Sequence, residues 1–376
     1  MEEISFFKPT ITSRESELIN EALNSQGTDM IDRLEESLKS YFDARHIIVT
    51  YNAAAAHHLA LCAMDIKRGD KIVCSVNAFP SVAQAIRHFD AEPIFVDIDE
   101  DDFNIDPNAL RATLNKHNHK KLKGVFVSHI GGQPAKMREI YEIAGEYGIK
   151  VLDDGNKSIG MTYDGKKIGN TGSFISCFQI SSQLKNPVAT AGFMITNDDE
   201  IAARAQLLRN YALLSGVDKY GNLGYIYDVV DIGVKYDITT LNAAYALAQF
   251  EKNDEFIARR AAIAEYYNKA LDGCPHVRTP VKKRDHVYTQ YIIKIDKNRD
   301  GFARELLEAG IHTSLHYIPI HMLKYYKDKY SLKVNDFPNA LKAYQQVLSL
   351  PIYNALKDSE VSYICEKIEQ IAKSRV

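Results

Sequence analysis

Short apolar runs alternate with segments of helical periodicity over the first half of the chain. The runs read HIIVT (46–50), DKIVCS (70–75), PIFVDI (93–98), GVFVSHI (124–130) and IKVLDD (149–154). Segments with apolar residues at helical spacing lie between them, at 53–64, 80–89 and 137–148. Strands that are apolar throughout and separated by helices are typical of a parallel sheet buried on both faces. The pattern predicts βαβ units from about residue 13 to 180.

The pattern changes in the second half of the chain. Residues 200–213 and 238–272 are predicted as long helices, the second region as one helix or two. A strand, a helix, a second strand and a final helix are predicted at 287–295, 301–310, 312–318 and from about Ser359. The sequence therefore predicts an α/β fold with two domains. The large domain spans residues 1–250 and contains a mixed, mostly parallel sheet, and a smaller α+β domain spans 251–376.

The length, the net charge and the N-terminal segment favour a cytoplasmic protein of more than one domain. A chain of 376 residues exceeds the size at which one hydrophobic core keeps growing. The net charge is −3, which gives no electrostatic reason to expect nucleic acid or a membrane surface as partner. The N-terminal MEEISFFKPTIT lacks the apolar core of a signal peptide, and no apolar run approaches the ~20 residues of a membrane span. We expect a cytoplasmic protein.

The cysteines give no sign of a metal site. The five of them lie far apart, and none forms a C-x-x-C pair or a Cys/His cluster with zinc-ligand spacing. Free thiols in a reducing compartment are the simpler interpretation.

Two features carry the candidate chemistry. Asp153 and Asp154 end a predicted buried strand, where α/β folds place ligands, and strand alternation lets at most one of them face a given site. Lys185 follows within FQISSQLKNPVATAG (178–192). An aspartate near a buried lysine suits pyridoxal phosphate (PLP), because the carboxylate keeps the ring nitrogen protonated and the amine forms the imine. The alternatives are a loop aspartate that caps a turn and a surface lysine.

Three weaker candidates surround these residues. Phe79 follows a strand and could stack on a cofactor ring, or belong to the core. Ala53 and Ala54 open a helix whose free N–H groups could hold a phosphate, without the glycines of a good phosphate loop. His316, Tyr317 and His321 form a polar and aromatic cluster that could bind a substrate or pack a domain interface.

Five segments in register resemble the DegT/StrS family of sugar aminotransferases. GDKIVCSVNAFPSVAQAI followed by EPIFVDID is similar to a strand, aromatic turn, helix and second strand of that family. The others are GGQPAKM (131–137, family "GQPADM"), LNAAYALAQFEK (241–252, "LQAALGLAQLE"), HYIPIH (316–321, "HYPxPLH") and LSLPIYNALKDSEV (348–361, "LPLHPxLT"). The resemblance implies a type I PLP-dependent aminotransferase fold and a homodimer with active sites at the subunit interface. It also implies transfer of an amino group, usually from glutamate, to a nucleotide-linked keto sugar.

Several residues can be matched one at a time. Asp154 matches the aspartate of the family's "EDAAQ", the partner of the ring nitrogen. Phe79 matches the aromatic residue that stacks on the ring, and Lys185 in LKN resembles the Schiff-base lysine of "SFHxxKN". HYIPIH, with His316, Tyr317 and His321, is expected to line the substrate site.

The cofactor motifs diverge from the family pattern. The glutamine of "EDAAQ", near the cofactor hydroxyl, is Lys157 here, and the phosphate turn "SGT" reads Asn52-Ala53-Ala54. The asparagine of "GxNYR", which reaches a neighbouring subunit's phosphate, corresponds to Lys235. Lys157 and Lys235 each add a positive charge at a cofactor-facing position. Ungapped alignment places the family lysine on Gln183 or Leu184 rather than on Lys185.

Three hypotheses follow from this comparison of motifs. The first is a PLP-dependent aminotransferase acting on a nucleotide-linked keto sugar during surface polysaccharide or glycan precursor synthesis. The second is a divergent family member with a rebuilt active site, a sugar-nucleotide enzyme that is either dehydratase-like or independent of PLP. The third is a non-catalytic homologue that binds a sugar nucleotide.

Overall fold

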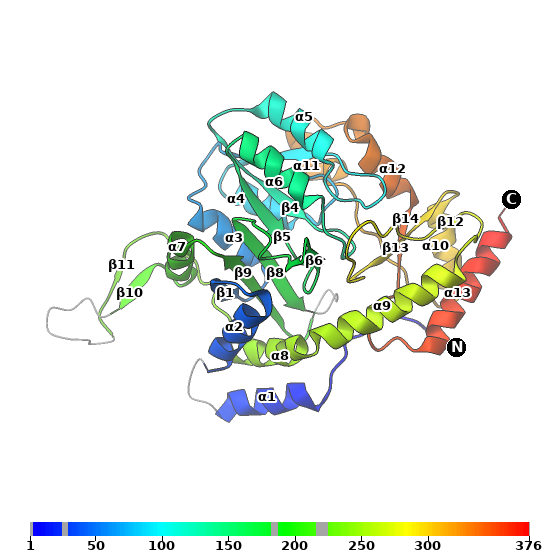
Figure 1. The fold of residues 1–376 in the computed structure, drawn as a ribbon, viewed down its shortest axis with the longest axis horizontal. Helices are drawn as coiled ribbons and strands as arrows, with labels where there is room; N and C mark the ends of the chain where they lie inside the picture. Colours follow the sequence, from blue (N-terminus) through cyan, green and yellow to red (C-terminus); the bar gives the residue numbers. More distant parts are fainter. Residues whose placement is uncertain (1–2, 25–28, 182–186, 216–224, 376) are drawn as a thin grey trace.

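A seven-stranded sheet forms the centre of the molecule (Figure 1). The computed structural model describes residues 3–24, 29–181, 187–215 and 225–375. Strand order is β1-β9-β8-β5-β4-β2-β3. The strands from β8 to β3 run parallel, whereas β9 is antiparallel to both of its neighbours. The α/β fold and the mixed, mostly parallel sheet are therefore confirmed.

The secondary structure of the described residues has the following bounds. The helices are α1 (Ser13–Asn24), α2 (Asp29–Phe42), α3 (Ala53–Ala63), α4 (Ser81–His88), α5 (Pro107–His117), α6 (Met137–Glu146), α7 (Asp199–Arg209), α8 (Thr240–Glu251), α9 (Asn253–Ala270), α10 (Arg299–Glu308), α11 (Lys324–Tyr330), α12 (Pro338–Gln346) and α13 (Asp358–Lys373), with 3₁₀ turns η1 (Ile320–Met322) and η2 (Val334–Asp336). The strands are β1 (His46–Thr50), β2 (Lys71–Ser75), β3 (Glu92–Val96), β4 (Leu122–Ser128), β5 (Lys150–Asp154), β6 (Thr162–Tyr163), β7 (Lys166–Lys167), β8 (Ile175–Ser181), β9 (Thr190–Thr196), β10 (Leu213–Ser215), β11 (Tyr227–Val229), β12 (Val277–Arg278), β13 (Tyr291–Ile295) and β14 (Val347–Leu350).

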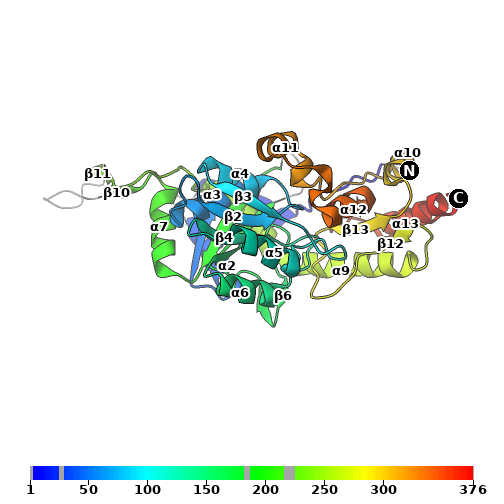
Figure 2. The same ribbon diagram turned by 90° about the horizontal axis from the view of Figure 1, so that it is seen from above.

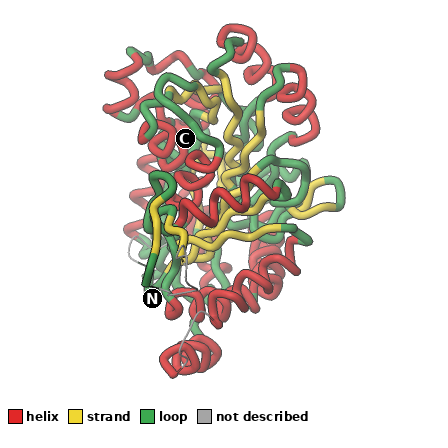
Figure 3. Tube along the Cα trace, turned by 90° about the vertical axis from the view of Figure 1, so that its left-hand side faces the viewer, coloured by secondary structure: helices red, strands yellow, loops and turns green. Residues whose placement is uncertain are grey.

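Helices cover both faces of the main sheet. On one face, α2, α5, α6 and α8 bury residues such as Leu38 and Ile140 against Val127 and Val151. On the other face, α3, α4 and α7 pack on the alternate strand residues, among them Leu152. Each such side chain contributes roughly 1.5–3 kcal/mol when fully buried. Figure 2 shows α4 and α6 on opposite sides, and Figure 3 shows the strands between helices.

A second unit follows the main sheet in the chain. Helix α9 extends from α8 towards the antiparallel sheet β12-β13-β14 (Figure 1). Ile293, Phe302 and Ile364 form its core together with Ile4 from the N-terminal segment. The domain boundary at residues 250 and 251 stays a prediction.

Helix ends depend on local hydrogen bonds and on backbone conformation. At the start of α1, the Glu15 carboxylate accepts hydrogen bonds from Thr12 N (2.7 Å) and Oγ1 (2.9 Å) and so caps the helix. The predicted helix 200–213 is too long, because α7 ends at Arg209 and Tyr211 and Ala212 have left-handed φ angles of 57° and 51°. The region 238–272 forms two helices, α8 and α9.

The predicted strand 312–318 is also wrong. Ser314 pairs with Ser349 through both backbone groups, at 3.0 and 2.8 Å, and this bridge is isolated. The chain then crosses to the main sheet, where Ile320 N donates to the carbonyl of Val76 (2.8 Å). A segment that connects two sheets cannot pair along its length with either of them.

Gly155 allows the loop after β5 to lie directly on a buried aromatic ring. A Cβ atom at this position would lie 2.2 Å from Cε1 of Phe178. The Phe178 ring is itself fixed, because it stacks on Phe193 with centroids 5.0 Å apart and also contacts Phe42. The ring has no free space to move into, so the loop that follows Asp154 depends on glycine.

We therefore predict that Gly155→Ala lowers the free energy of unfolding by about 1–3 kcal/mol through overpacking. Urea denaturation midpoints measure the change. Gly145→Ala is the matched control, since a Cβ at this position on α6 meets nothing within 4 Å and alanine favours a helix. Equal midpoints for Gly155→Ala and the wild type would contradict the packing described here.

Candidate active site

The carboxyl ends of β5, β4 and β2 meet at one edge of the main sheet. Ser128 at the end of β4 is in register with Asp154 at the end of β5, and β2 leads into Asn77 and Phe79. Ligands of open α/β sheets bind outside such strand ends. The residues gathered here, which we name the strand-end cluster, are His57, Phe79, Ser128, Asp154, Lys157, His316 and Tyr317.

Asp154 is a buried carboxylate with several donors. Ser128 Oγ donates to Oδ2 (2.9 Å), and the backbone N–H of Asn156 points to Oδ1 (3.4 Å). His57 Nε2 lies 3.4 Å from Oδ1. Burial acts to raise the pKa of Asp154, but His57, Ser128 and the Asn156 N–H outweigh burial and lower the pKa below its usual value. Asp154 is therefore ionised at neutral pH.

His57 reaches Asp154 from α3, which packs on one face of the main sheet. Its ring is fully buried and packs edge-on against Phe126, with centroids 5.2 Å apart. Among the described residues, neither ring nitrogen has a partner within hydrogen-bond geometry. The interaction of the imidazole with Asp154, at 3.4 Å, is therefore mainly electrostatic.

The neighbouring Asp153 faces the other layer of the protein. Its carboxylate accepts from Ser176 Oγ (2.7 Å) and lies 3.6 Å from His129 Nε2. The two adjacent aspartates thus have separate partners, as strand alternation predicts, and Asp154 belongs to the strand-end cluster.

Phe79 and Tyr317 lie at the mouth of the cluster. The Phe79 side chain is 61% exposed, and its ring centroid is 6.3 Å from that of Tyr317. The backbone N–H of Tyr317 donates to Asn77 Oδ1 (3.3 Å), and the hydroxyl accepts from Gln290 Nε2 (3.4 Å). Burial raises the pKa of Tyr317, and the Asp154 charge adds to the rise, so the phenol stays protonated.

Lys157 and His316 are electrostatic neighbours within the cluster. Nδ1 of His316 is 2.7 Å from Ser349 Oγ, and burial, together with the charge of Lys157, lowers the pKa of His316 to about 3. Burial lowers the pKa of Lys157 as well; Asp154 opposes this effect and Arg260 adds to it. His316 is therefore neutral, and Lys157 loses its proton more readily than an exposed lysine.

Uncharged side chains accept hydrogen bonds from some of the free backbone N–H groups at the N-terminus of α3. Asn52 Oδ1 accepts from Ala55 N (2.9 Å), and Gln179 Oε1 accepts from Ala53 N (2.9 Å). Ala53 is buried and Ala54 is exposed. Side-chain amide oxygens thus accept hydrogen bonds from N–H groups that the sequence analysis expected to bind a phosphate.

Two predicted residues are not brought to the cluster within this chain. His321 is buried, with Nε2 3.0 Å from the carbonyl of Val334 and its ring against Phe337. Lys235 donates from Nζ to Asn210 Oδ1 and Asp237 Oδ2, both at 2.9 Å, near the base of β10. Lys185 lies outside the described residues.

Sequence reasoning missed His57, Ser128 and Gln179. Ser128 ends the strand beside β5, a signal that would have identified it once the strand order was known. His57 and Gln179 have no such signal, because a histidine within an alanine-rich helix and a glutamine within an apolar strand show their partners only in three dimensions.

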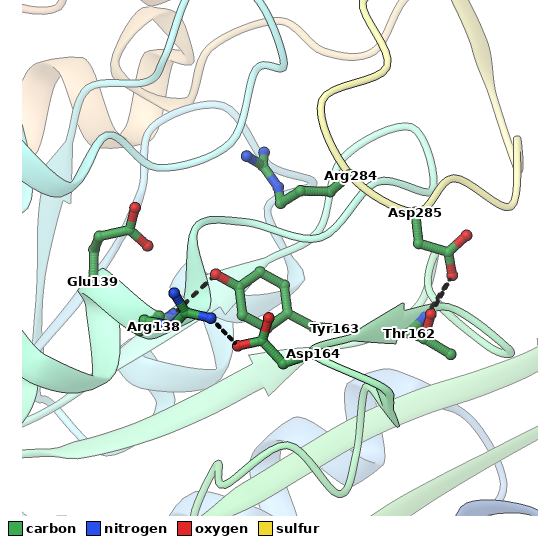
Figure 4. Close-up of a pocket in the computed structure, with 7 residues that line it drawn as sticks. All are labelled: Arg138, Glu139, Thr162, Tyr163, Asp164, Arg284 and Asp285. Carbon is green, nitrogen blue, oxygen red and sulfur yellow. Dashed lines mark hydrogen bonds and ion pairs between the residues drawn. The ribbon is translucent and has the colours of Figure 1, made fainter.

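A separate surface depression of about 440 Å³ lies beside the β6–β7 hairpin (Figure 4). Arg138 pairs with Asp164 (2.8 Å), and Asp285 accepts from the N–H and hydroxyl of Thr162 at 2.7 and 2.8 Å. Arg284 pairs with Asp102. The Asp285 contacts fasten the loop before β13 to the hairpin, and the Arg138 pair joins the hairpin to α6.

None of the helices in the described ranges has the length and apolar character needed to cross a membrane.

Comparisons with known proteins agree with this geometry. Residues 9–369 match the model of the DegT/DnrJ/EryC1/StrS aminotransferase family. The chain is 31% identical to the spore coat polysaccharide biosynthesis protein SpsC of Bacillus subtilis, over 97% of this chain and 96% of SpsC.

Solved structures show the same fold. PseC of Helicobacter pylori, an aminotransferase involved in the biosynthesis of pseudoaminic acid, superposes with a TM-score of 0.89 over all of both chains at 21% identity. Spr1654 of Streptococcus pneumoniae in its PLP-form gives 0.90 over 99% of each chain, also at 21% identity. The type I fold expected from the resemblance is thereby confirmed, and the family match over nearly the whole chain decides the classification. This chain belongs to the DegT/DnrJ/EryC1/StrS aminotransferase family.

Proposed function

We propose that this protein is a PLP-dependent aminotransferase that converts a nucleotide-linked keto sugar into an amino sugar, with an amino acid such as glutamate as donor. Family membership supports the reaction class, and the polysaccharide role of SpsC and the pseudoaminic acid role of PseC support a sugar substrate. The proposed setting is the synthesis of a surface polysaccharide or glycan precursor. A cytoplasmic location stays a prediction.

The buried, ionised Asp154 is the observation that carries the proposal. A carboxylate at this strand end, held by Ser128 and approached by His57, fits the nitrogen end of the PLP ring. The exposed ring of Phe79 is free to stack on an aromatic ligand.

The phosphate end fits with a changed set of donors. Asn52 and Gln179 supply carboxamides, which can turn to offer their NH₂ groups, and the α3 N-terminus favours an anion. Lys235 of a second subunit is the further candidate for this phosphate. These donors replace the hydroxyl groups that the resemblance leads one to expect at this turn.

PLP, when bound, supplies an electron sink for the pair left behind when a proton leaves carbon. Asp154 would hold the ring nitrogen protonated and Phe79 would fix the ring plane. Lys185 is the residue we propose for the covalent bond to the cofactor. Near neutral pH, His316 is a neutral imidazole and Tyr317 a protonated phenol. Both would orient the substrate.

We expect Asp154→Asn to weaken PLP binding by about 1.5–3 kcal/mol, roughly tenfold to a hundredfold, because a charged hydrogen bond becomes a neutral one. Titration of the near-ultraviolet or visible absorbance of bound PLP measures the affinity. Asp164→Asn, on the β6–β7 hairpin, is the matched control and should bind as the wild type does. A wild-type protein that does not bind PLP at all would favour the rebuilt or non-catalytic hypotheses.

His57→Leu should make PLP binding more sensitive to acid. The wild-type carboxylate of Asp154 has a lowered pKa, so it stays ionised as the pH falls until that pKa is reached. Without His57, less opposes the effect of burial, so the pKa of Asp154 rises and affinity is lost at a higher pH. Affinities measured across the acid range test this. The control is His58→Leu, whose ring stacks on Phe89 instead, and identical acid limbs in His57→Leu and wild type would refute the role of His57.

We also propose a homodimer, supported by the β10–β11 arm that projects beyond α7 (Figure 1, Figure 2). Apolar side chains on it and just after it are exposed, with Leu214 at 44%, Tyr227 at 65% and Ile232 at 88%. Apolar groups exposed together are typical of an interface. A second copy of this chain is the partner that would also bring Lys235 to a neighbouring site.

Light scattering after size exclusion should therefore give twice the chain mass for the wild type. Tyr227→Glu combined with Ile232→Glu should shift the protein toward the mass of a single chain, because charges would be buried at the contact. Leu307→Glu, at an exposed position on α10, should leave the dimer intact. A monomeric wild type would exclude this assembly.

A further inference from the structure

Gln290 connects the loop after β4 to the phenol of Tyr317. Its side chain is buried, directly before β13. The amide oxygen Oε1 accepts from the backbone N–H of Gly131 (3.2 Å), and Nε2 lies 3.4 Å from the hydroxyl of Tyr317. The backbone N–H of Gln290 also donates to the carbonyl of Gly131 (3.0 Å). Gly131 therefore holds both the main chain and the side chain of Gln290 in place.

These contacts determine which end of the carboxamide faces the phenol. A backbone N–H can only donate, so the oxygen of the Gln290 side chain must face Gly131. The NH₂ group then faces Tyr317, and this group too can only donate. The phenol oxygen is thus the acceptor in this pair, and the proton of the Tyr317 O–H must point away from Gln290.

In the part of the chain that the structure describes, no group accepts a hydrogen bond from the Tyr317 hydroxyl. Tyr317 is nonetheless held at both ends, because its backbone N–H donates to Asn77 Oδ1 (3.3 Å) and its hydroxyl meets Gln290. Its half-buried ring lies beside His316 and the exposed Phe79, with centroid distances of 4.9 and 6.3 Å. A phenol fixed in this way at the mouth of the strand-end cluster offers one unused donor to a ligand.

The charge at the site favours a neutral acceptor for this donor. Burial, together with the anion of Asp154, raises the pKa of the Tyr317 phenol, so the proton stays on its oxygen. The same anion disfavours a carboxylate or a phosphate at this point. Among the reacting groups of the proposed reaction, the ketone is neutral and can only accept. After amination the carbon carries an ammonium group, which can only donate, so the contact distinguishes the substrate from the product.

We propose that Gln290 is a positioning residue that directs the O–H of Tyr317 to the keto oxygen of the sugar. This inference rests on the proposed function. The hydrogen bond places the ketone and draws electron density from its carbon, which favours attack by an amine. No proton is transferred in this contact, since the phenol keeps its proton and the Gln290 amide occupies the lone pair of the phenol oxygen. The site thereby selects a carbonyl group over an amino group at the reacting carbon.

Infrared spectroscopy tests this hydrogen bond without turnover. The probe is the tightest binder among UDP-, dTDP- and GDP-linked keto hexoses, labelled with ¹³C at the keto carbon and added to the PLP form, which has no amino group to transfer. The bound carbonyl stretch should lie at a lower frequency in the wild type than in Tyr317→Phe, because a hydrogen bond weakens the C=O bond. Equal frequencies in these two proteins overturn the proposal.

Gln290→Glu reverses the direction of the contact with almost no change in shape. Once ionised, the new carboxylate accepts from both Gly131 and Tyr317, which turns the phenol proton away from the sugar and should give the higher carbonyl frequency. Gln345→Glu makes the same change at an exposed position on α12 and should match the wild type. A wild-type frequency in ionised Gln290→Glu contradicts the role of Gln290.

The two half-reactions separate a positioning role from a structural one. Single-turnover absorbance of the bound cofactor follows L-glutamate in the first half-reaction and the keto hexose in the second. Tyr317→Phe and Gln290→Glu should slow only the second, about three- to tenfold, as expected for the loss of one hydrogen bond. In Gln290→Glu the second rate should recover as the pH falls, because a protonated carboxyl group can donate to the phenol as the amide does.

The outcomes separate this inference from the proposed function. Equal slowing of both half-reactions, or a Gln290→Glu rate without the added pH dependence, overturns the role of Gln290 and leaves the proposed function in place. A wild type that does not bind PLP, or that transfers no amino group to any of the keto hexoses, overturns both. Melting temperature and PLP absorbance show whether a slow variant is folded and loaded.

Discussion

The buried carboxylate of Asp154 is the constraint on which the site depends. Burying an anion at the end of a central strand is costly unless donors surround it. Three elements meet this requirement: β4 supplies Ser128, the loop after β5 supplies the backbone N–H of Asn156, and α3 supplies His57. The parallel order of β4 and β5 and the packing of α3 on the sheet are therefore also what keeps this charge in place.

The rest of the cluster is organised around that fixed charge. Tyr317 and His316 arrive on a segment that leaves the three-stranded sheet to contact the end of β2, and burial keeps both in their uncharged forms. The charges of Asp154 and Arg260 act on Lys157 with opposite signs, and burial lowers the pKa of its amine. The permanent anion of this site, Asp154, is suited to holding a protonated ring nitrogen.

Sequence periodicity predicted the parallel core because strands buried on both faces are continuously apolar, and the position of Asp154 followed from the end of such a strand. The sequence could not predict His57, which meets Asp154 only because α3 packs on the main sheet, or Gln179, whose amide reaches the α3 N-terminus from β8. The segment 312–318 looks like a strand by composition, yet it connects two sheets. Tertiary contacts determine the roles of His57 and Gln179 and the conformation of segment 312–318, and the local sequence pattern carries no information on such contacts.

Asp154 should keep the ring nitrogen of bound PLP protonated. NMR of PLP labelled with ¹⁵N in the ring, bound to the wild-type protein at neutral pH, reads the protonation state of that nitrogen. We expect the chemical shift of a pyridinium nitrogen. A shift typical of an unprotonated pyridine in the wild-type complex would contradict it.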